Sequence, residues 1–100
     1  MDRELAFEDS AIAVILATRP GDLMTYGEVA SEAGYPGAAR AVGSLLRKVP
    51  DLPWWRIISS TGRLLPRLRQ EQAELLRTEG HRIHNGRVAP DNVASTNDDL

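Results

Sequence analysis

Cysteine is absent from this chain of 100 residues. Its absence excludes disulfide bonds, thiolate metal sites and catalysis by a thiol, and it is compatible with a reducing compartment. Long apolar runs are also missing, because the longest, residues 11–17, is far too short to cross a membrane. The N-terminus begins acidic and does not have the basic and then apolar pattern of a secretion signal. We therefore expect one small, soluble, cytoplasmic domain.

Signals for catalysis and for bound metals are equally scarce. His81 and His84 are three residues apart, but no Cys and no obvious carboxylate partner accompanies them, so a zinc site is not expected. Ser59 and Ser60 lack the Gly-x-Ser-x-Gly pattern of a serine hydrolase. A glycine-rich phosphate loop is missing as well. We expect no catalytic residue, no metal and no cofactor.

Positive charge is present but segregated. The net charge is −2, yet residues 36–69 hold seven cations against the single acid Asp51, a local charge of +6. Because binding responds to the local potential, this segment predicts contact with a polyanion such as nucleic acid. Nearly all of the cations are Arg, whose planar guanidinium suits multidentate contacts with phosphate. The charge pattern alone leaves a solvated charged face as the alternative.

Hydrophobic periodicity and turn residues predict a mainly helical fold. A capping box at Thr25 and Glu28 marks the start of one of the helices. The expected helices cover about residues 5–17, 25–34, 37–48 and 70–79.

Two further segments suggest short strands. Residues 57–59 predict a strand, and Asn85-Gly86 predicts a hairpin over 83–88. Two short helices followed by a small hairpin resemble a helix-turn-helix with a wing, so we expect a winged-helix-like fold. The polar and acidic residues 91–100 are typical of a disordered tail.

The helix expected over 37–48 has two distinct faces. At about 100° per residue, one face is apolar and the opposite one is small and cationic. Small residues let a helix approach a DNA groove closely, and an Arg on such a face can enter the groove. A solvated helix face is the alternative. The apolar face holds Ala38, Ala41, Val42, Leu45 and Val49, and the other holds Arg40, Gly43, Ser44 and Arg47.

Three separated motifs carry a family resemblance. They are Thr25–Ala30, Gly37–Gly43 and Pro53–Ile57. In order and spacing they resemble the DNA-binding domain of O6-alkylguanine-DNA alkyltransferases over about residues 7–85. That family has a reactive Cys where this chain has Trp54, and an activating His at Trp55.

Trp replacing the Cys is the mark of the alkyltransferase-like proteins, which this chain resembles most closely. The resemblance implies the mainly α, winged-helix-like fold of the alkyltransferase C-terminal domain over residues 1–90, and a monomer. It also implies a non-enzymatic sensor that binds O6-alkylguanine in double-stranded DNA by nucleotide flipping. Such proteins direct the lesion to nucleotide excision repair, so repair proteins are expected partners and the nucleoid the expected place of binding.

The resemblance also implies roles for single residues. Tyr26 matches the residue that rotates the 3′ phosphate of the target nucleotide, and Arg40 matches the finger that replaces the extruded base. Trp54 and Arg67, thirteen residues later, match the wall of the lesion pocket. The DNA-binding set is Tyr26, Ala39, Arg40, Gly43, Ser44 and Arg47, and the lesion-pocket set is Trp54, Trp55, Arg56 and Arg67.

Two positions depart from the family pattern. Relatives usually have His or Gln where Trp55 stands, and an indole N–H can only donate a hydrogen bond. Glu79 matches the acid that would orient the catalytic His, which is missing here. We expect Glu79 to form a salt bridge or to lie in a helix cap instead.

Two other functions remain open at the level of sequence. A helix-turn-helix transcriptional regulator would read bases with the third helix, and its affinity would depend on sequence rather than on a lesion. A residual hydrolase would use the alkylguanine pocket, but no residue near Trp54 supplies a general base.

Overall fold

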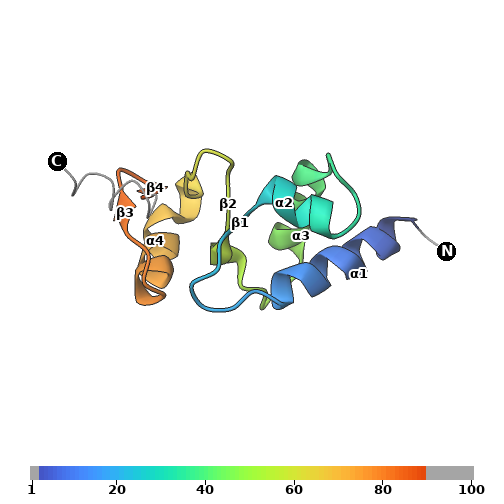
Figure 1. Ribbon diagram of the computed structural model, residues 1–100, viewed down its shortest axis with the longest axis horizontal. Helices are drawn as coiled ribbons and strands as arrows, with labels where there is room; N and C mark the ends of the chain where they lie inside the picture. Colours follow the sequence, from blue (N-terminus) through green and yellow to red (C-terminus); the bar gives the residue numbers. More distant parts are fainter. Residues whose placement is uncertain (1–2, 90–100) are drawn as a thin grey trace, which may run out of the picture.

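The computed structural model describes residues 3–89 and shows a mainly helical chain. Helices α1, α2 and α3 gather at one end, and α4 lies at the other end with the hairpin β3–β4 (Figure 1). The short strands β1 and β2 lie between the two groups. The bounds are α1 Arg3–Leu16, β1 Met24–Thr25, α2 Tyr26–Glu32, α3 Ala39–Lys48, β2 Ile57–Ile58, α4 Arg69–Thr78, β3 Ile83–His84 and β4 Arg87–Val88, with 3₁₀ turns η1 at Trp54–Arg56 and η2 at Pro66–Leu68.

Helix α1 buries one stripe of its surface. Phe7, Ala11 and Ile15 are spaced four residues apart and therefore lie on one face, where all three are buried. They form one cluster with residues of α2 and α3 and with β2. The helix ends at Leu16, and just beyond it the Thr18 hydroxyl donates to the Ile15 carbonyl at 2.7 Å. Within residues 3–89 no helix has the length and apolarity needed to cross a bilayer.

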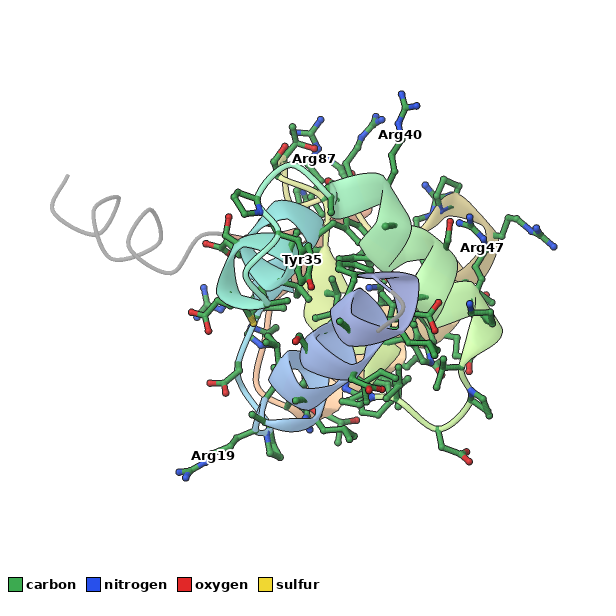
Figure 2. All side chains as sticks on the ribbon, turned by 90° about the vertical axis from the view of Figure 1, so that its right-hand side faces the viewer. Arg19, Tyr35, Arg40, Arg47 and Arg87 are labelled. Carbon is green, nitrogen blue, oxygen red and sulfur yellow. The ribbon has the colours of Figure 1, made fainter. Side chains whose placement is uncertain are left out.

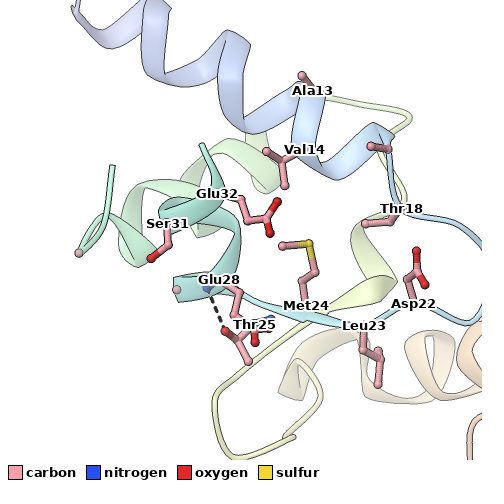
Figure 3. A pocket seen from close by; sticks show the side chains of 13 residues that line it. Ala13, Val14, Thr18, Asp22, Leu23, Met24, Thr25, Glu28, Ser31 and Glu32 are labelled. Carbon is pink, nitrogen blue, oxygen red and sulfur yellow. Dashed lines mark hydrogen bonds between the residues drawn. The ribbon is translucent and has the colours of Figure 1, made fainter. Parts of the chain in front are cut away.

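The predicted capping box starts α2. The Thr25 hydroxyl accepts from the Glu28 backbone N–H at 3.0 Å, and the Glu28 carboxylate accepts from the Thr25 N–H at 2.8 Å (Figure 3). The pair satisfies two of the N–H groups that a helix start leaves without partners. This local device sets where α2 begins and places Tyr26 in its first turn.

Helix α3 follows a turn in which Gly37 has a φ of 92°, so the helix begins at Ala39, later than expected. Val42 and Leu45 are buried, as the apolar face predicts. Ala41 was expected on that face but is exposed, because it lies at the edge of the buried stripe.

Strand β2 joins the two halves of the core. It pairs in parallel with β1, with Met24 opposite Ile57 and Thr25 opposite Ile58. Because successive side chains of a strand point to opposite faces, Ile57 enters the cluster of α1–α3 while Ile58 enters a second cluster. That second cluster consists of Ile58, Leu64, Ala73 and Leu76. Strand β1 was not predicted, because two residues are too few to show a periodicity.

The predicted Asn-Gly hairpin forms the wing. Asn85 and Gly86 have φ values of 54° and 74°, the positive values that a two-residue turn of this kind requires. Two backbone hydrogen bonds, Leu64 N–H to Gly86 O and Val88 N–H to Gly62 O, tie the hairpin to the preceding loop. The expected mainly α, winged-helix-like fold is confirmed. The tail expected at 91–100 lies outside the described residues.

Candidate nucleic-acid interface

One groove, of about 1090 Å³, collects most of the residues that the sequence pointed to. It lies between the start of α2, helix α3, the segment that follows α3, and η2. Trp55 and Arg56 are the two predicted site residues that do not line it. The predicted residues in its lining are Tyr26, Ala39, Arg40, Gly43, Ser44, Arg47, Trp54 and Arg67.

Helix α3 presents its small and cationic face to this groove. A Cβ added to Gly43 would meet no atom within 4 Å, so open space lies above the helix at this point. Arg40 is exposed and projects away from the ribbon, while Arg47 donates to the Ser44 hydroxyl at 3.2 Å (Figure 2). An accessible backbone flanked by two Arg side chains suits close approach to a nucleic-acid strand.

The charges of the groove are predominantly positive. Arg40, Arg47, Lys48 and Arg67 line it together with the single acid Asp51. Lys48 forms an ion pair with Glu8 of α1, so part of its charge is already compensated within the protein. The three Arg side chains therefore carry most of the attraction for phosphate.

Tyr26 lies at the edge of the groove, at the first turn of α2. Burial raises the pKa of its phenol above the ordinary value of 10.0, and the Arg47 charge opposes this in part. The phenol is therefore protonated at neutral pH. It can donate a hydrogen bond to a phosphate oxygen.

An apolar wall faces the cationic helix. Trp54 is half-buried, packs into neither hydrophobic cluster of the described chain, and lines the groove beside Leu65, Pro66 and Leu68. The sequence reasoning had named Trp54 and Arg67 here but missed the three apolar residues. Their signal was the apolar sequence on both sides of Arg67, with Leu65 and Pro66 before it and Leu68 after it, and Pro66 begins η2.

Trp55 and Arg56 point instead to Glu79, at the end of α4. The Trp55 indole Nε1–H donates to Glu79 Oε2 at 2.8 Å, and Arg56 Nη2 donates to the same oxygen at 2.8 Å. Arg56 also binds the Thr18 carbonyl at 3.0 Å and lies 5.4 Å from the centre of the Trp55 ring. The expected salt bridge of Glu79 is therefore present, and Trp55 adds a hydrogen bond to the same carboxylate.

The Glu79 carboxylate is held by donors on several segments. Besides Arg56 and Trp55, the Gly21 N–H donates to Oε1 at 3.2 Å. The hydrogen bond from Arg56 is the main cause that lowers the pKa of Glu79 to about 2, while burial opposes it. Glu79 is thus ionised at neutral pH and cannot act as a general acid there.

Comparison with known proteins identifies the family. The family described as 6-O-methylguanine DNA methyltransferase, DNA binding domain, matches residues 6–81. The chain belongs to this family. The resemblance inferred from the three motifs is confirmed.

Relatives in this family include proteins named for base flipping and for likeness to the alkyltransferases. A DNA base-flipping protein of Vibrio parahaemolyticus is 41% identical over 83 residues, which are 77% of this chain and 83% of that protein. Alkyltransferase-like protein 1 of Schizosaccharomyces pombe is 37% identical over 71 residues, 64% of this chain and 66% of that protein. The S. pombe Atl1 structure in complex with damaged DNA containing O6-carboxymethylguanine superposes with a TM-score of 0.78 at 28% identity, covering 94% of this chain and 95% of that one.

A second groove, of about 1030 Å³, lies on the other side of α2 and differs from the first in its charge. Asp22, Glu28 and Glu32 line it without any Lys or Arg (Figure 3). Glu28 is two positions after Tyr26, about 200° around the helix, so the acidic groove and the cationic groove lie on different faces. A phosphate backbone is repelled from the first and attracted to the second.

Proposed function

We propose that this chain recognises O6-alkylguanine in duplex DNA by flipping the damaged nucleotide into the cationic groove, and that it leaves the alkyl group in place. The observation that carries the proposal is the joint lining of one groove by Arg40 of α3 and by Trp54, which stands where the family has its nucleophile. One side of the groove can hold DNA open and the other can receive a base.

The proposal divides the work among four residues. Arg40 enters the duplex and fills the gap left by the extruded base, while the Tyr26 phenol turns the phosphate of the target nucleotide. Trp54 and Arg67 contact the flipped base and its O6 substituent, the first through an aromatic face and the second through hydrogen bonds. Flipping costs about a few kcal/mol in lost stacking and pairing, and these contacts compensate for it.

Alkyl transfer is not part of the proposed function. Trp54 offers no nucleophilic atom, and the chain has no Cys anywhere in its 100 residues. Glu79, at the position of the acid that orients the family His, is engaged by Trp55 and Arg56. A protein that binds the lesion without removing it serves as a marker, and we propose that it directs the lesion to nucleotide excision repair.

The test is a binding comparison on one oligonucleotide duplex. Fluorescence polarisation measures affinity for duplexes that differ only in guanine or O6-methylguanine at a single position, at one stated salt concentration. The proposed function predicts tighter binding to the methylated duplex. A second pair of duplexes with scrambled flanking sequence is the control. A sequence-specific regulator would respond to the flanks and ignore the methyl group, and this outcome would refute the proposal.

A further inference from the structure

Trp54 has no polar anchor of its own. Within the described part of the chain, no hydrogen bond holds its indole N–H. Its ring meets the ring of Trp55 edge to face, with centroids 6.2 Å apart and an interplanar angle of 87°. The orientation of the groove wall therefore depends on the residue next to it.

Trp55, in contrast, is held by four contacts. Its Nε1–H donates to Glu79 Oε2 at 2.8 Å, and the Arg56 guanidinium lies 5.4 Å from the ring centre. Its carbonyl accepts from Gln72 Nε2 at 3.1 Å, and Gln72 is fully buried. The ring also packs against the second hydrophobic cluster of Ile58, Leu64, Ala73 and Leu76.

The acceptor for this indole is itself immobilised. Glu79 takes hydrogen bonds from Arg56 and from the Gly21 backbone, and its side chain is only 10% exposed. Arg56 in turn binds the Thr18 carbonyl beyond α1. A rotation of Trp55 would leave a buried carboxylate without one of its donors, which is costly.

We infer that Trp55 is a positioning residue. Glu79 fixes the ring of Trp55, and Trp55 in turn holds Trp54 at the wall of the cationic groove. In this way Trp55 sets the preference of the groove for alkylated over undamaged guanine. This inference rests on the proposed function and goes further, because it assigns specificity to a residue that does not line the groove.

A fixed wall is needed because the two bases that the groove must distinguish differ very little. Guanine and its O6-alkylated form differ by one substituent, so a wall distinguishes them only if it keeps its position when either base enters. A ring that rotates freely adapts to both bases and loses conformational entropy when one of them binds. A ring fixed in advance avoids that entropy and keeps its contacts with the substituent.

The first measurement uses the wild-type chain. With two Trp residues, the protein gives two assignable indole N–H signals in a ¹H–¹⁵N NMR spectrum. On addition of the O6-methylguanine duplex we expect the Trp54 signal to shift, while the Trp55 signal stays in place and exchanges slowly with solvent. A Trp55 signal that shifts as much as that of Trp54, or that exchanges rapidly in the free protein, would overturn the inference.

The second measurement removes the donor and keeps an aromatic ring. We expect Trp55→Phe to lower the ratio of lesion to undamaged affinity by at least about tenfold, the lower end of the range for losing one hydrogen bond to a charged group, with undamaged affinity unchanged. Ile58→Val is the matched control, because it loosens the cluster on which the Trp55 ring packs and keeps the hydrogen bond from the indole to Glu79. Its ratio should equal that of the wild type.

The outcomes separate the two proposals. A Trp55→Phe protein that discriminates as well as the wild type, or that loses both affinities in parallel, overturns the inference alone. A wild type that binds both duplexes equally refutes the proposed function and the inference with it. If Trp55→Phe does not fold, the NMR measurement on the wild type still decides.

Discussion

Arg56 and Glu79 form a two-point ion pair between η1 and the end of α4. Arg56 Nη2 lies 2.8 Å from Glu79 Oε2, and Arg56 Nε lies 3.1 Å and 3.2 Å from the two carboxylate oxygens. Each side chain is 10% exposed, so water contributes little to the solvation of either charge. The pair therefore links η1, which carries Trp54 of the groove wall, to the end of α4, which packs in the second hydrophobic cluster.

The first prediction concerns the pH dependence of this pair. The folded pKa of Glu79 is about 2, below the ordinary value of 4.5. The stability that its charge contributes is therefore complete above about pH 4.5 and is lost as the pH falls toward about 2. Near neutral pH, Glu79→Gln should reduce the free energy of unfolding by about 3–5 kcal/mol, because it leaves the buried Arg56 unpaired.

Urea unfolding of the wild type and of Glu79→Gln at several pH values is the measurement. The difference between the two proteins should shrink as the medium becomes acidic, because the wild-type carboxyl is then protonated as well. Glu74→Gln, on the exposed face of α4, serves as the control and should differ little from the wild type at any pH. A constant difference for Glu79→Gln down to the lowest pH would contradict the assigned pKa.

The second prediction follows from the missing thiol. Incubation with a duplex that contains O6-methylguanine should leave the intact mass of the protein unchanged. The protein should also protect that lesion competitively from an active alkyltransferase, because both bind the same base. Mass spectrometry of the intact protein is the check, with the active alkyltransferase as the positive control. A gain of one methyl group would show that the chain is an enzyme.

The third prediction tests Arg40 as the residue that holds the duplex open. Arg40→Ala should weaken binding to the lesion duplex by about 1–3 kcal/mol. Thermal melting should not change, because the side chain is exposed. Arg19→Ala is the matched control, since Arg19 is also exposed but points away on the opposite side of the molecule (Figure 2). Equal affinities of wild type and Arg40→Ala would leave Arg40 as an ordinary solvated side chain.

The fourth prediction separates contact with the base from contact with the phosphates. Arg67→Ala should lower the ratio of lesion to undamaged affinity, because it removes a contact that only a flipped base can make. Arg47→Ala should weaken both complexes about equally and make the salt dependence shallower by roughly one unit. Titrations at several salt concentrations measure both effects. A parallel loss of both affinities in Arg67→Ala would assign Arg67 to the backbone instead of the pocket.

Several elements were predictable because their signals are local. The Thr25 and Glu28 capping box, the buried Val42 and Leu45 on the apolar face of α3, and the Asn85-Gly86 turn each depend on residues a few positions apart. Such patterns act through the immediate backbone, so they are legible in the sequence before any tertiary contact exists. The family motifs were legible for the same reason, as was the replacement of the expected Cys by Trp54.

The amino-acid sequence by itself thus determined the helices, the wing and the absence of a cysteine at the position of Trp54. Only the tertiary structure decided which of these residues meet. It paired β1 with β2, placed Arg67 in one groove with Arg40, and turned Trp55 and Arg56 toward Glu79, 24 and 23 positions away. It also paired Lys48 with Glu8 across 40 positions. Contacts at such separations carry no sequence period, because they form only when the packing of the whole core brings distant segments within hydrogen-bond distance.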